Sequence, residues 1–158
     1  MASGALARLS TDTVKTLSST QLNALPAASA SVTALSTAQV VNLNAAFVSA
    51  LSTSQVRGMT TDQRAALTTT SVVALTATQV GSMSTSQVAA LTTGQVKALE
   101  TADIAALSTG QVKALTTSQV AAMEVADLKA LNSDQVSALT ATQIGALTAA
   151  HLIGLMGK

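Results

Sequence analysis

The chain lacks most of what builds an ordinary globular core. It has no Cys, Trp or Tyr, and a single aromatic residue, Phe47, among 158 residues. The absence of cysteine excludes disulfides and thiolate metal ligands. Only 9% of the residues are charged and the formal net charge is +1, whereas a typical domain is about 25% charged. Disordered chains combine low hydropathy with high net charge, so a mean hydropathy of +0.46 predicts that this chain folds.

The composition also argues against several classes of function. There is no nucleophile elbow, no Gly-rich phosphate loop and no Cys, and the one histidine, His151, lacks companions that would make it a base or a ligand. The chain has eight basic and seven acidic residues, so it has little net positive charge with which to bind phosphates, and it has no series of aromatic residues to stack on bases. We therefore expect no enzyme activity, no cofactor, no metal site and no nucleic-acid partner.

Long apolar runs are missing as well. No stretch approaches the roughly 18 uninterrupted apolar residues of a membrane helix. The start, "MASGALARLS", lacks the apolar segment of a secretory signal. We expect neither a membrane span nor an N-terminal targeting signal.

What the sequence does contain is an eight-residue repeat. Leu or Met recurs at intervals of eight from Leu9 to Leu155, and the single interval of ten contains the only proline, Pro26. The consensus is L-[ST]-T-x-Q-V-x-A, over 18 consecutive octads. The predicted organisation is an irregular lead-in over 1–8, one repeat array over 9–154 with a two-residue insertion near 25–28, and a tail over 155–158.

A period of eight excludes one long helix. Eight residues of α-helix turn through about 800°, so successive leucines would be displaced by about 80° and the apolar positions would wind over the whole surface. In a strand, Leu at position 1 and Val at position 6 would lie on opposite faces. A β-solenoid with corners that redirect the chain therefore stays open as an alternative.

One short helix per octad accounts for the repeated Ser, Thr and Gln. Ser or Thr at position 2 and Gln at position 5 have the spacing of a capping box, and Leu at position 1 and Val at position 6 are then the two partners of a hydrophobic staple. Ten such boxes in one register begin at Ser18, Ser36, Ser52, Thr60, Thr76, Ser84, Thr92, Ser108, Thr116 and Thr140. The principal predicted cap pairs are Ser36 and Gln39, Ser52 and Gln55, Thr76 and Gln79, Thr92 and Gln95, Ser108 and Gln111, Thr116 and Gln119, and Thr140 and Gln143.

The predicted fold is an all-α solenoid of very short helices. Val, Ala and the next Leu share one face of each helix, whereas positions 3, 4 and 7 face water. A helix of about six residues is only about 9 Å long and is not stable alone, so neighbouring helices must share a core. The number of octads per turn stays open, because lysines recur at 16 residues and the acidic segments "ETAD" and "EVAD" recur at 24.

Departures from the consensus are the candidates for a binding surface. Arg64 stands where most octads have Val, and we expect its long side chain to lie along the surface with its charged end in water. Phe47 stands at a Gln position, where we expect it to fill space near Pro26. The candidate interaction residues are Phe47, Arg57 and Arg64.

Two resemblances are carried by the octads themselves. "LTTSQVAAM" (115–123) and "LTATQVGSM" (75–83) resemble the opening helix of TAL effector repeats, but the second helix and base-reading loop of those repeats have no counterpart, and we attribute the likeness to shared capping. The tandem octads are similar to repeat regions of very large bacterial surface or secreted proteins of the adhesin type. That resemblance implies a stalk or spacer in a larger secreted or cell-surface protein.

Three functions follow as hypotheses. The first is a structural solenoid that spaces, displays or scaffolds other domains and associates end to end. The second is a protein-interaction module that uses the face of positions 3, 4 and 7. The third is binding to ice or another surface by a threonine ladder at position 3, formed by Thr53, Thr61, Thr69, Thr85, Thr93, Thr101, Thr109 and Thr117.

Overall fold

The computed structural model describes residues 30–33 and 35–157, together with Thr13 and Thr16. The predicted box at Ser18 and the insertion near 25–28 lie outside these residues. The described helices are α4 (Ala30–Thr33), α5 (Thr37–Val40), α6 (Ala45–Ala50), α7 (Thr53–Gly58), α8 (Thr61–Ala65), α9 (Thr69–Val73), α10 (Ala77–Gly81), α11 (Thr85–Ala89), α12 (Thr93–Ala98), α13 (Thr101–Ala105), α14 (Thr109–Ala114), α15 (Thr117–Ala122), α16 (Val125–Ala130), α17 (Ser133–Ala138), α18 (Ala141–Gly145) and α19 (Ala149–Met156).

Each octad from 35 onward forms one short helix, which begins at position 3. The residue at position 2 is extended and is the N-cap of the helix. The Leu or Met that follows the helix either is its extended C-cap, as at Leu51 with φ −60° and ψ 135°, or comes after one or two further turn residues. No strand occurs among the described residues, so the all-α prediction is confirmed and the β-solenoid alternative is wrong. The last helix continues through Met156 and so includes the first two residues of the predicted tail.

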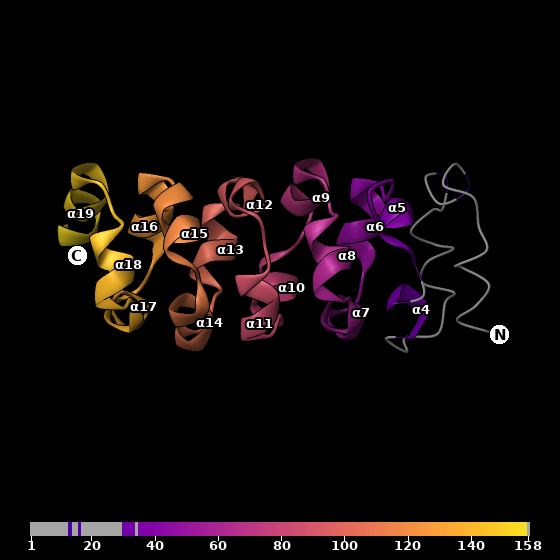
Figure 1. Ribbon diagram of the computed structural model, residues 1–158, viewed down its shortest axis with the longest axis horizontal. Coiled ribbons are helices and arrows are strands. Elements are labelled where there is room, and N and C mark those ends of the chain that lie inside the picture. Colours follow the sequence, from indigo (N-terminus) through magenta and orange to yellow (C-terminus); the bar gives the residue numbers. More distant parts are fainter. Residues whose placement is uncertain (1–12, 14–15, 17–29, 34, 158) are drawn as a thin grey trace.

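The helices wind into an elongated solenoid, with α4 and α19, the first and last described helices, at opposite ends (Figure 1). Each described helix from α4 to α16 packs on the helix three further along the chain, which sorts the helices into three columns. The α10 column contains α4, α7, α10, α13, α16 and α19; the α8 column contains α5, α8, α11, α14 and α17; the α9 column contains α6, α9, α12, α15 and α18.

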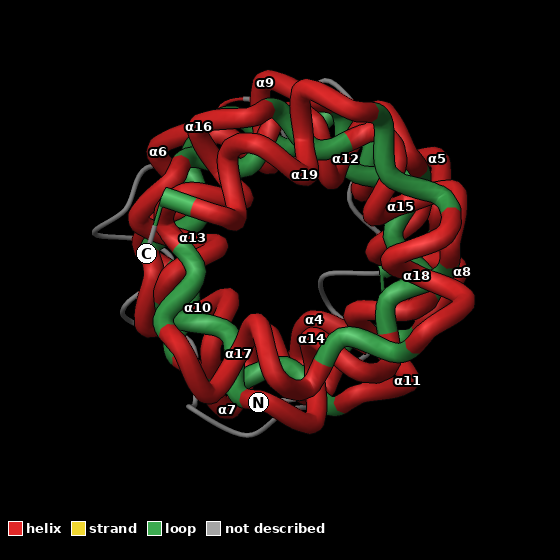
Figure 2. The backbone as a smooth tube through the Cα atoms, turned by 90° about the vertical axis from the view of Figure 1, so that its left-hand side faces the viewer, coloured by secondary structure: helices red, strands yellow, loops and turns green. Residues whose placement is uncertain are grey.

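One turn takes more than three octads and fewer than four. Packing joins helices three octads apart, whereas side-chain hydrogen bonds between turns join residues 28 to 31 positions apart. A step of 28 residues is three and a half octads, and Figure 2 accordingly shows α17 next to α10 when the solenoid is viewed along its axis. The sequence periods of 16 and 24 therefore do not give the length of a turn.

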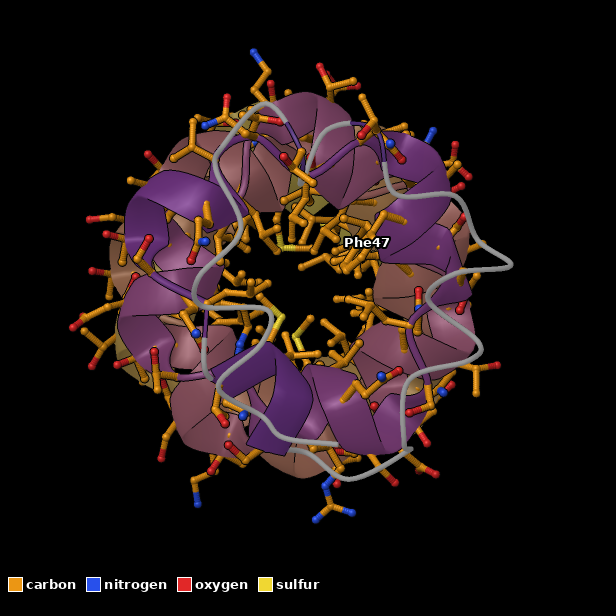
Figure 3. All side chains as sticks on the ribbon, turned by 90° about the vertical axis from the view of Figure 1, so that its right-hand side faces the viewer. Phe47 is labelled. Atoms are coloured by element: carbon orange, nitrogen blue, oxygen red, sulfur yellow. The ribbon has the colours of Figure 1, made fainter. Side chains whose placement is uncertain are left out.

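The apolar core runs along the axis of the solenoid. Val at position 6 is almost completely buried in most described octads, and Leu or Met at position 1 is buried beside it. Side chains point inward from every side of the ring, and Phe47 is among them (Figure 3). This continuous core explains why helices of four to six residues are stable, since each one covers apolar surface of its neighbours.

Candidate functional site

The glutamine at position 5 is the polar side chain on which the architecture depends. In α15, the Gln119 amide N–H donates to Thr116 Oγ1 at 3.2 Å, and the Thr116 amide N–H donates to Gln119 Oε1 at 2.7 Å. Both halves of a capping box are therefore present. Reciprocal boxes occur in the described residues at Ser36, Ser52, Thr60, Thr76, Ser84, Thr92, Ser108, Thr116, Asn132, Thr140 and Thr148.

The same glutamine also reaches the preceding turn. Gln119 Nε2 donates to the backbone carbonyls of Val88 at 2.9 Å and Leu91 at 2.6 Å, which lie 31 and 28 residues earlier. The carbonyls at the end of a helix have no partner within that helix. Gln119 therefore caps the start of its own helix with its oxygen and the end of α11 with its nitrogen.

These amide bridges recur along the described array. The side chains are buried, and an unpaired buried polar group costs about 1–3 kcal/mol of folding free energy. The bridge formed by one glutamine therefore contributes substantially to the stability of the array. The bridging residues are Gln63, Gln79, Gln87, Gln95, Gln111, Gln119, Gln135 and Gln143.

Sequence reasoning identified the cap and missed the bridge. A capping box accepts Glu as well as Gln, yet no octad has Glu at position 5. Only the amide carries N–H donors, so the absence of Glu was the available signal that this side chain also donates to another group.

Five described octads replace this glutamine; one has the apolar Phe47, and the other four keep a polar side chain. Ser71 Oγ reaches the carbonyl of Leu43 at 3.1 Å and so keeps one bond between turns. In His151, Nδ1 accepts the Thr148 amide at 3.4 Å. Asp103 and Asp127 accept their N-cap amides, from Glu100 at 3.0 Å and Glu124 at 2.9 Å.

The two aspartates are buried, with 2% and 4% of their surfaces exposed. Burial raises the pKa of the Asp103 and Asp127 carboxyl groups, because it disfavours the charged form, and the hydrogen bond from the N-cap amide partly opposes the rise.

Arg64 is a correction to the sequence interpretation. The prediction that it lies along the surface is wrong: its side chain is completely buried because position 6 points to the axis of the solenoid. Nη2 donates to the carbonyl of Met59, whereas Nε and Nη1 have no hydrogen-bond partner in the described structure. Burial lowers the pKa of Arg64 to about 10.

The other two candidate interaction residues differ in their exposure to solvent. Phe47 is 1% exposed, so it belongs to the core and cannot contribute to a solvent face. Arg57 is exposed and is the one candidate of the three that a partner can reach. The threonines at position 3 lie at the start of successive helices around the ring, so a row such as Thr61, Thr85 and Thr109 follows the α8 column.

Few other features of the described residues offer a site. A shallow surface groove of about 470 Å³ lies between α14 and α17, lined by Thr109, Gly110, Lys113 and residues 137–140. No group of three His, Cys, Asp or Glu side chains in the described part is placed to hold a metal ion. Even α19, the longest described helix at eight residues, is far shorter than a bilayer-spanning helix, which takes about 20 residues.

Comparison with known proteins agrees with the repeat architecture. No curated protein and no solved structure matches the chain. The profile of the ALTTAQ repeat matches in five overlapping positions, at residues 32–69, 48–77, 72–100, 96–126 and 120–155. Because these matches run from residue 32 to residue 155, which is most of the sequence, the chain belongs to the ALTTAQ repeat family.

Proposed function

We propose that the array is a non-catalytic structural solenoid that acts as a spacer, stalk or scaffold. The observation that supports this most is the repeated amide bridge, which joins each turn to the preceding one in the same way over most of the described chain. With a continuous axial core, such an array is a rod whose length increases with the number of octads.

The surface supports the same proposal. The helix positions that face water carry mainly small side chains such as Thr, Ser, Ala and Gly, with isolated lysines. Phe47, the one aromatic side chain, is buried, so the described surface has no exposed aromatic anchor of the kind that hot spots for a specific partner commonly use. The similarity of the octads to repeats of adhesin-type proteins supports a stalk at a cell surface.

Rod-like behaviour is tested by the distance between two fluorophores. The chain has no cysteine, so Ser54→Cys and Ser137→Cys, both at exposed positions, label only these sites. We expect a narrow distance distribution by single-molecule energy transfer, and a shorter but equally narrow one after deletion of residues 84–107, which are three octads. Replacement of the same residues by a Gly/Ser linker of equal length is the control and should broaden the distribution. A broad distribution in the parent chain, or a distance that the deletion leaves unchanged, contradicts the proposal.

End-to-end association belongs to the same proposal and is supported by α19. Ile153 and Met156 are 70% and 81% exposed, the most exposed large apolar side chains among the described residues. Exposed apolar clusters commonly mark contact surfaces. We expect sedimentation velocity to show association that increases with concentration and is weakened by Ile153→Ser with Met156→Ser. A monomer at every concentration would remove this part of the proposal.

A further inference from the structure

Three of the residues that replace the bridging glutamine lie in one column. Asp103 in α13, Asp127 in α16 and His151 in α19 occupy the position of Gln79 in α10, at steps of 24 residues. Helices α10, α13, α16 and α19 pack directly on one another in that order. The ionisable replacements are therefore stacked as consecutive neighbours, and the α8 column has Gln at every described position.

The two aspartates keep one function of the glutamine and lose the other. Each accepts its N-cap amide, as Gln Oε1 does. A neutral Gln also donates to carbonyls 28 and 31 residues earlier, and the corresponding carbonyls are those of Leu75 and Val72 for Asp103. An ionised carboxylate has no hydrogen to donate. A protonated carboxyl group has one O–H to donate.

The surroundings do not neutralise the carboxylates. The elements packed against α13 and α16 carry Glu100, Glu124 and Lys129, which are exposed, and the buried His151; α10 carries no charged residue. One turn away, Lys97 in α12 and Asp134 in α17 are also exposed. The charge of the N-cap Glu beside each Asp further disfavours its ionisation.

We propose that α13 and α16 each form an acid-strengthened seam with the turn that precedes them, in which protonation of Asp103 and Asp127 supplies the hydrogen-bond donors between turns that Gln supplies elsewhere. At neutral pH the two carboxylates are buried without these donors and the seams are the weakest junctions among the bridged turns. At acid pH each carboxyl group takes up a proton, its O–H points to the preceding turn, and the junction tightens.

The direction of the pH dependence follows from the two pKa values of each group. Burial raises the pKa of Asp103 and Asp127 in the folded state above the value in the unfolded chain. The folded state therefore binds more protons, and stability from these groups is fully present below the unfolded pKa. It decreases as pH rises through the folded pKa and is lost above it.

The test is urea unfolding of the full chain between pH 4 and pH 7.5. We expect the unfolding constant of the wild type to rise with pH, by up to about a hundredfold per pH unit, which is the limit for two protons. Asp103→Gln with Asp127→Gln restores the consensus and should abolish the rise and make the protein more resistant at pH 7. The matched control, Asp62→Asn with Asp134→Asn, changes two exposed aspartates and should retain the wild-type pH dependence.

Amide hydrogen exchange locates the effect. We expect the amides of α13 and α16 to exchange more slowly at pH 5 than at pH 7, after correction for intrinsic rates, and those of α11 and α14 to be unchanged. His151→Gln separates the histidine from the aspartates and should leave the pH dependence in place. A pH-independent wild type, or a dependence that survives in the double Gln variant, would overturn the proposal. Because none of these measurements depends on length or association, they are independent of the proposed function.

Discussion

The α8 column and the α10 column repeat the same short helix, but the α10 column replaces the Gln at position 5 by Asp in α13 and α16. Gln63, Gln87, Gln111 and Gln135 in the α8 column cap their own helices and bridge to the preceding turn. In the α10 column Asp103 and Asp127 accept their N-cap amides in the same way, but they have no side-chain N–H with which to bridge to the preceding turn. The reciprocal half of the capping box therefore needs an acceptor at position 5, whereas the bond between turns needs a hydrogen-bond donor there, such as the amide of Gln or the hydroxyl of Ser71.

The largest change in stability is expected when an aspartate replaces a bridging glutamine of the α8 column. Gln111→Asp places a carboxylate where Gln111 Nε2 now donates to Met83 at 2.8 Å and Val80 at 3.2 Å. Because a buried charge without a partner is costly, we expect the free energy of unfolding to fall by about 3–5 kcal/mol at pH 7. Chemical denaturation followed by circular dichroism measures this change.

The matched control is Gly110→Asp, which adds the same charge at an exposed position of the same helix. We expect it to change stability by less than about 0.5 kcal/mol. If the two variants were equally stable, the bridge of Gln111 would contribute nothing and the distinction between the columns would be lost.

The next largest effect is expected at Arg64, in the column that has Gln at every described position 5. Arg64→Val restores the consensus and removes a guanidinium whose Nε and Nη1 have no partner. Replacement of buried charged groups by apolar residues is often stabilising by about 1–4 kcal/mol, and we expect a gain in this range, measured as a higher urea midpoint. Arg57→Val, at an exposed position, should have little effect. A loss of stability in Arg64→Val would show that the guanidinium stabilises α8 through its bond to Met59.

The caps could be predicted from sequence because they are local. Thr116 and Gln119 are three residues apart, and their spacing alone defines the box. The bridge from Gln119 to Leu91 depends on the number of octads in a turn, which follows from packing between helices and leaves no clear period in the sequence. Arg64 was misplaced for a related reason. A long side chain usually reaches water from the edge of a core, but position 6 faces the axis of a closed ring, from which its side chain cannot reach the surface.

The smallest change in stability is expected from replacing either of two glycines at position 7, which end helices of nearly identical sequence. Gly81 ends α10 in "ATQVG" and Gly145 ends α18 in "ATQIG". Ala is favoured over Gly within a helix by about 0.8–1 kcal/mol. A Cβ at Gly145 would meet no atom within 4 Å, whereas a Cβ at Gly81 would lie 2.9 Å from the backbone oxygen of Ala106, at the end of α13.

We therefore expect Gly145→Ala to stabilise the array by about 0.5–1 kcal/mol, because the helix gains propensity at no steric cost. Gly81→Ala should not increase stability and is expected to lower it. The new Cβ would contact the Ala106 backbone oxygen, which cannot rotate away as a flexible side chain can, so α10 and α13 would have to move apart. Thermal unfolding of the two variants side by side measures the difference. Equal gains in both would mean that α10 and α13 are loosely packed, and that the α10 column is weakened at this junction as well as at its aspartates.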